Sequence, residues 1–99
     1  MDERQQGYVF RGLIYNMALA HYGGKNQSVI ALEELSEAQK ELCKFLRGEG
    51  DIDHLAEEVA DAFIMLEQVE RMFGIRDKVT REMEKKVLRL SQRIQRDKE

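Results

Sequence analysis

Apolar side chains recur every three or four residues along most of this chain, which is the spacing of one face of an α-helix. Four stretches carry the pattern, and glycine separates each from the next. We expect helices over residues 3–21, 28–47, 53–73 and 77–96. The chain contains no proline to interrupt them. The pattern therefore predicts an all-α fold.

Residues at the ends of these stretches support the same boundaries. Ser28 and one of Asp51 and Asp53 are side chains that commonly cap helix N-termini. Glycines stand where helices commonly end, at Gly23 with Gly24, at Gly48 and at Gly74. Because the intervening segments are short, we expect neighbouring helices to run antiparallel in a four-helix up-down bundle.

The length of the chain limits how much it can bury. Its 99 residues fit a single domain spanning residues 1–99, and a domain of this size has only a modest core. We therefore expect the bundle to be completed by association with other copies. A homodimer is the expected assembly, and a tetramer remains open.

Composition narrows the class of protein further. The net charge of −3 argues against nucleic-acid binding. Residues 1–70 hold 14 acidic and six basic side chains, whereas residues 71–99 hold five acidic and ten basic. No apolar run is long enough to span a membrane, and the first residues are too polar for a signal peptide. With a single cysteine, Cys43, these features predict a cytoplasmic protein.

Two pairs of carboxylates stand out because of the direction in which they point. On a helical wheel Glu34 and Glu58 fall among the apolar side chains, with Glu37 and Asp61 beside them at spacing i, i+3. Glu41 lies on the same side as Glu34. Acids on a solvated face, such as Glu33 and Glu57, are common in a chain of this composition, and that remains the alternative interpretation.

Ionised carboxylates on a buried face are costly unless a cation or hydrogen bonds compensate them. Oxygen ligands without cysteine or histidine at ligand spacing favour Mg²⁺, with Mn²⁺ as a substitute. A di-iron site would need Glu-x-x-His pairs, which His21 and His54 do not supply. The pattern therefore points to a divalent-cation site.

The segments EELSE (33–37) and EEVAD (57–61) together resemble the ExxE…ExxD signature of the MazG-like all-α nucleoside triphosphate pyrophosphohydrolases. The flanking sequence is also similar, with YGGKNQ before the first motif and a basic segment after the second. The resemblance covers residues 20–95 or so. It implies an oligomeric helical bundle in which Glu34, Glu37, Glu58 and Asp61 bind Mg²⁺.

The implied reaction is hydrolysis of an NTP or dNTP to the monophosphate and pyrophosphate. Glu37 or Glu41 is the expected activator of the attacking water. Lys86, Arg89 and Arg93 form one row on the last predicted helix, and the resemblance suggests that they contact the phosphates. Lys25, in the predicted glycine loop, is a further phosphate candidate.

Two other functions are compatible with the sequence. One is a phosphoribosyl-ATP pyrophosphohydrolase, although Ala31-Leu32 and the run 63–66 stand where that family tends to carry a lysine and a histidine. The other is a helical oligomer that serves as an interaction module without catalysis. That second reading predicts that Glu58 and Asp61 pair with lysine or arginine of the fourth helix.

Overall fold

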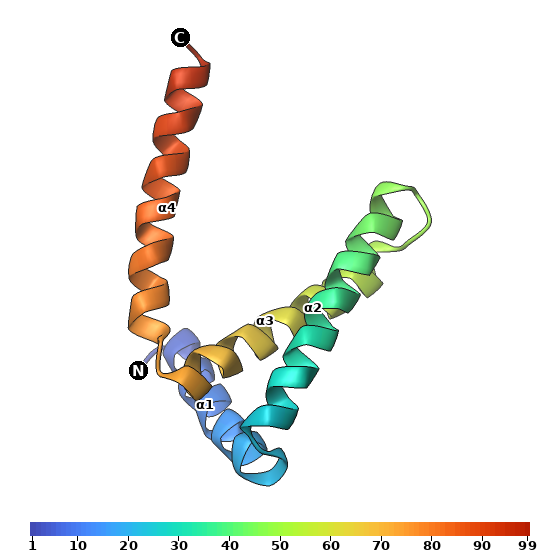
Figure 1. Cartoon of the computed structure of the whole chain (residues 1–99), viewed down its shortest axis with the longest axis vertical. Coiled ribbons are helices and arrows are strands. Elements are labelled where there is room, and N and C mark those ends of the chain that lie inside the picture. The colour runs from blue at the N-terminus through green and yellow to red at the C-terminus, as the bar shows by residue number, and fades with distance from the viewer.

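The computed structural model describes all 99 residues. It contains four α-helices and no strands (Figure 1). The helices are α1 (Glu3–Tyr22), α2 (Gly24–Leu46), α3 (Ile52–Phe73) and α4 (Arg76–Asp97). The predicted all-α class and the number of helices are confirmed. None of the four helices combines the length and the hydropathy that crossing a bilayer requires.

The predicted ends of the helices are mostly confirmed. Asp51 is the N-cap of α3, because its carboxylate accepts a hydrogen bond of 2.8 Å from the backbone N–H of His54. Gly74 ends α3 in the left-handed conformation, with φ of 61°, which glycine adopts at little cost.

The prediction for the start of the second helix is wrong. Ser28 does not cap α2 but lies inside it, where its hydroxyl donates to the carbonyl oxygen of Gly24 at 2.8 Å. The reason is that Gly23, with φ of 88°, makes the whole turn between α1 and α2. The helix can therefore begin at Gly24, and the expected glycine loop around Lys25 is helical.

The centre of the molecule is the antiparallel pair formed by α2 and α3 (Figure 1). Ala31, Ala62 and Met65 are buried between them. At the α1 end of this pair, the buried Gln27 side chain donates a hydrogen bond of 2.7 Å to the buried Gln68 side chain. Small side chains at the interface allow the two helix backbones to come close together.

Helix α1 is joined to α3 mainly through Glu67. The hydroxyl of Tyr15 donates to this carboxylate at 2.8 Å, and the guanidinium of Arg11 pairs with it at 3.0 Å. Burial of Tyr15, together with its hydrogen bond to Glu67, raises the pKa of the tyrosine to about 12. These contacts hold α1 against the end of α3 and leave the rest of the α2–α3 pair uncovered.

Helix α4 leaves the other three helices after Gly74 and projects away from them (Figure 1). It has no buried residue. Near its start, the guanidinium of Arg76 lies over the ring of Tyr8, at 3.9 Å from the ring centroid. The expected up-down bundle of four helices is therefore not closed within a single chain.

The open arrangement leaves much apolar surface exposed. Only eight of the 99 residues are buried, so most large apolar side chains contact solvent. The accessible surface is 8067 Å², whereas a compact protein of this length exposes about 5,800 Å². The radius of gyration is 16.6 Å, compared with about 13 Å for a compact domain.

Candidate metal centre

Three of the predicted acidic side chains converge on the surface of the α2–α3 pair. One carboxylate oxygen each from Glu34 of α2 and from Glu58 and Asp61 of α3 lies within 4.8 Å of the other two. The i, i+3 spacing places Glu58 and Asp61 on adjacent turns of one helix face. The buried Ala31 and Ala62 lie next to this group, where their small side chains bring the two helices together.

The electrostatics of the group are unfavourable for three isolated carboxylates. Partial burial of Glu34 raises its pKa, and the nearby charges of Asp61, Glu58 and Glu37 raise it further. No lysine or arginine forms an ion pair with Glu34, Glu58 or Asp61. One oxygen of Glu58, Oε2, is buried and has no hydrogen-bond partner.

These properties fit a hard divalent cation. The donors are three carboxylates from two helices, and Mg²⁺ and Mn²⁺ prefer such oxygen ligands. A cation would also offset the repulsion among the acids and would give the unpartnered Oε2 of Glu58 a partner. Glu34, Glu58 and Asp61 are therefore the residues of this chain best placed to hold a metal.

The fourth predicted ligand, Glu37, is placed differently. It lies one turn beyond Glu34 on α2, is exposed, and is not among the three residues whose oxygens converge. Its charge nevertheless acts on Glu34, because it contributes to the raised pKa of that residue. Glu37 therefore lies at the edge of the group, in contact with solvent.

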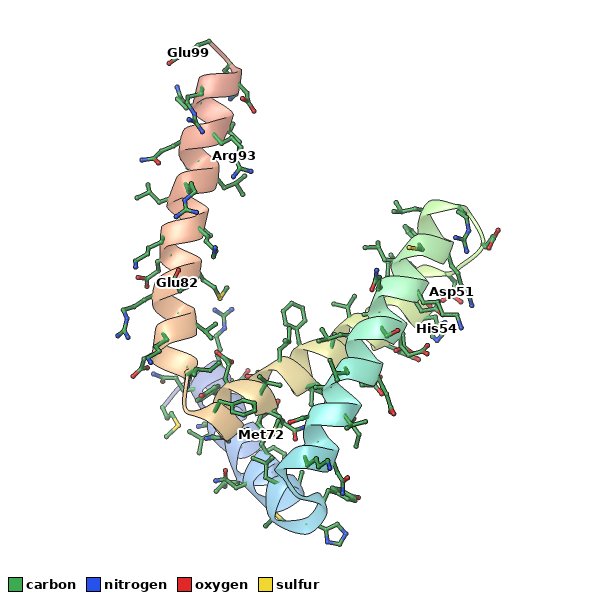
Figure 2. The ribbon with its side chains drawn as sticks, viewed as in Figure 1. Asp51, His54, Met72, Glu82, Arg93 and Glu99 are labelled. Atoms are coloured by element: carbon green, nitrogen blue, oxygen red, sulfur yellow. The ribbon has the colours of Figure 1, made fainter.

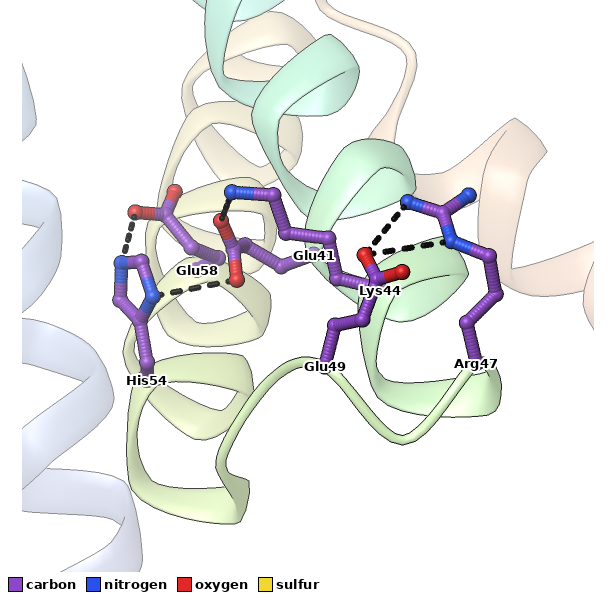
Figure 3. Close-up of polar contacts among 6 residues, drawn as sticks. All are labelled: Glu41, Lys44, Arg47, Glu49, His54 and Glu58. Atoms are coloured by element: carbon purple, nitrogen blue, oxygen red, sulfur yellow. Dashed lines mark hydrogen bonds and ion pairs between the residues drawn. The ribbon is translucent and has the colours of Figure 1, made fainter.

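Glu41 is not free to act on a water molecule in the way that its position on the wheel suggested. Its side chain is only 5% exposed, and both oxygens are in ion-pair contact. Oε1 lies 3.6 Å from Nζ of Lys44, and Oε2 lies 3.1 Å from Nδ1 of His54 (Figure 3).

His54 is a residue that the sequence did not assign to the site. Its Nδ1 faces Glu41, and its Nε2 lies 3.4 Å from Oε1 of Glu58 (Figure 3). The i, i+4 spacing from His54 to Glu58 is a signal that could have suggested this contact. The contact with Glu41 depends on how α2 and α3 pack, and a wheel for one helix cannot reveal it.

The predicted phosphate contacts are not near the acids within one chain. Lys86, Arg89 and Arg93 lie on the exposed helix α4. Figure 2 shows Arg93 towards the far end of α4, separated from His54 and Asp51 at the far end of the α2–α3 pair. Lys25 is exposed in the first turn of α2.

A separate hollow of about 260 Å³ lies where α1 meets the end of α3 and the start of α4. Tyr8, Tyr15, Glu67, Arg71 and Arg76 are among the residues that line it. It contains none of the acids or cations that the sequence assigned to a site. The hydroxyl of Tyr15 donates a hydrogen bond to Glu67 there, so these two side chains join α1 to α3.

Comparison with protein-family models, with curated proteins and with solved structures finds no match to this chain. A function is therefore inferred from the residues of the chain and from their arrangement.

Proposed function

We propose that this protein is a Mg²⁺-dependent hydrolase that converts a nucleoside or deoxynucleoside triphosphate to the monophosphate and pyrophosphate. The observation that carries the proposal is the convergence of Glu34, Glu58 and Asp61 within 4.8 Å. These residues belong to the two sequence motifs that resemble those of the MazG-like pyrophosphohydrolases. The cation would offset the charge of the triphosphate oxygens and of the phosphoryl group during transfer.

The remaining acids then take distinct roles. Glu34, Glu58 and Asp61 hold the cation. Glu37, which is exposed beside them, orients the attacking water and accepts a proton from it at its carboxylate. Glu41 is less suited to this role because its two oxygens face Lys44 and His54.

The active form is an assembly of copies, with a homodimer as the smallest. The single chain exposes about 2,200 Å² more surface than a compact protein of its length. Two copies that buried this excess would form an interface of about 4,400 Å², within the range of obligate homodimers. In this assembly Lys86, Arg89 and Arg93 of one copy approach the acids of another and contact the phosphates.

A non-catalytic interaction module is the second candidate, because the extent of exposed apolar surface favours a protein that binds other helices. That function predicts ion pairs between the acids of α3 and the cations of α4. No ion pair joins these two helices in the chain. Because both functions could bring α4 to the acids between copies, this absence does not separate them. The convergence of three carboxylates is what favours the cation site.

The test is product analysis with purified protein, Mg²⁺ and a panel of NTPs and dNTPs. The expected products are the nucleoside monophosphate and pyrophosphate in equal amounts. A variant with both Glu34→Gln and Asp61→Asn should be inactive, whereas Glu57→Gln on the solvated face should retain activity. Release of orthophosphate would overturn the proposed bond cleavage, and full activity of the double variant would overturn the proposed ligands.

A further inference from the structure

A series of polar contacts leads from Lys44, through the buried Glu41, to the group of acids proposed to bind the cation. Lys44 lies 3.6 Å from Glu41, Glu41 lies 3.1 Å from His54, and His54 lies 3.4 Å from Glu58 (Figure 3). The series crosses from α2 to α3 at the contact between Glu41 and His54. It ends on one of the three carboxylates that converge.

The position of His54 is fixed from two directions. Its backbone N–H donates to the carboxylate of the N-cap residue, Asp51, at 2.8 Å, which holds the first turn of α3. Its ring atom Nδ1 lies 3.1 Å from Oε2 of Glu41, whose side chain is only 5% exposed. The ring therefore presents Nε2 to the carboxylate one turn further along α3.

The consequence appears at the two oxygens of Glu58. Oε1 faces Nε2 of His54 at 3.4 Å, whereas Oε2 is buried and has no hydrogen-bond partner. A glutamate side chain has three rotatable bonds, so a contact at one oxygen restricts where the other can point. In metal sites, partners of this kind hold a ligand in the orientation that the cation requires.

We propose that His54, anchored by Glu41, is a positioning residue that orients the carboxylate of Glu58 toward the cation held with Glu34 and Asp61. This inference rests on the proposed function, because it assumes that the three acids bind a cation. It goes further because it proposes that two residues that are not ligands, His54 and Glu41, increase the affinity of the site for the cation. Removal of such partners typically weakens metal binding by about 10–100-fold.

The test is the affinity of the full chain for Mn²⁺, measured by electron paramagnetic resonance with no nucleotide present. The proteins are wild type, His54→Gln, Glu41→Gln, and the variant with both changes. His21→Gln is the matched control, because His21 is exposed and forms no ion pair. His54→Asn provides a second test of the ring, and because the His54 side chain is 46% exposed we expect both His54 variants to fold.

Each single change should weaken Mn²⁺ binding by about tenfold or more, and His21→Gln should leave it unchanged. The double change should weaken binding no more than His54→Gln alone, because Glu41 acts through His54. If Glu41→Gln does not fold, the two His54 variants decide the question by themselves.

Other outcomes would overturn the inference. Unchanged Mn²⁺ affinity in His54→Gln, with a lower unfolding temperature, would mean that His54 only joins α2 to α3. Independent, multiplying losses in the double variant would mean that Glu41 does not act through His54. Wild-type protein that binds no Mn²⁺ would overturn the proposed function as well, so the two failures are distinguishable.

Discussion

At the scale of single residues, Glu34 lies in an electrostatic environment that is unfavourable for its charged form unless a cation is bound. Its carboxylate is partly buried and faces the charges of Asp61, Glu58 and Glu37, which together raise its pKa. The proposed cation site would account for this arrangement, whereas a helix pair selected only for stability would avoid it.

The raised pKa of Glu34 gives a prediction about pH. The folded protein binds more protons than the unfolded chain between the ordinary glutamate pKa, near 4.5, and the higher value in the fold. The stability of the metal-free protein should therefore fall as pH rises through this interval and remain lower above it. Glu34→Gln should remove this dependence and raise the unfolding temperature at neutral pH by on the order of a few degrees.

The measurement is thermal unfolding in chelator from pH 4 to pH 8 or so, at one protein concentration. Glu57→Gln is the matched control, since its carboxylate lies on the solvated side of α3 and should give a curve like that of the wild type. A Glu34→Gln protein less stable than the wild type at neutral pH would contradict the electrostatic explanation.

At the scale of elements, the structure shows which end signals are decisive. Asp51 acts as a cap because the residue after it starts the helix, and its carboxylate meets a free N–H. Ser28 carries the same chemical signal but lies five residues after Gly23, whose positive φ makes the turn, so its hydroxyl donates a hydrogen bond within the helix instead.

Substitution by alanine is therefore expected to affect stability at Asp51 but hardly at Ser28. Asp51→Ala should lower the free energy of unfolding by about 1 kcal/mol, because the N–H of His54 loses its partner. Ser28→Ala should change it by less than about 0.5 kcal/mol, because alanine is the better helix former inside α2. Urea unfolding of both variants tests the pair, and an equal loss in both would contradict the observed start of α2.

The element scale also explains how far the sequence could lead. Periodicity located all four helices and placed Glu34 and Glu58 on the apolar sides of theirs, since both inferences need only one helix at a time. It could not reveal that Asp61 would join Glu34 and Glu58 while Glu37 would stay outside, because that depends on the packing of α2 against α3. The contact of His54 with Glu41 was missed for the same reason.

At the scale of the whole molecule, α4 is the helix that buries none of its residues within a single chain. Its apolar stripe, which includes Met83, Val87, Leu90 and Ile94, is exposed along its length. Neither periodicity nor caps indicate whether such a stripe packs within one chain or between chains. The expected bundle was therefore predictable as a set of helices, but its closure was not.

Association through α4 makes a testable prediction. Leu90→Glu should disrupt the proposed assembly, because it places a charge in a stripe that the assembly would bury. Gln92→Glu adds the same charge on another side of α4 and should leave the assembly intact. Sedimentation velocity measures both, with helicity checked by circular dichroism, and a wild-type protein that sediments as a monomer at all concentrations would contradict the assembly.

The unfolding temperature of the protein with and without Mg²⁺ or Mn²⁺ shows whether the three acids bind a cation. If Glu34, Glu58 and Asp61 form a cation site, metal at about 100 times its dissociation constant should stabilise the wild type by about 2.7 kcal/mol. Glu57→Gln should retain this stabilisation, and Glu58→Gln should lose it. No shift of the wild-type unfolding temperature at any millimolar metal concentration, or an equal shift in Glu58→Gln, would contradict the proposed cation site.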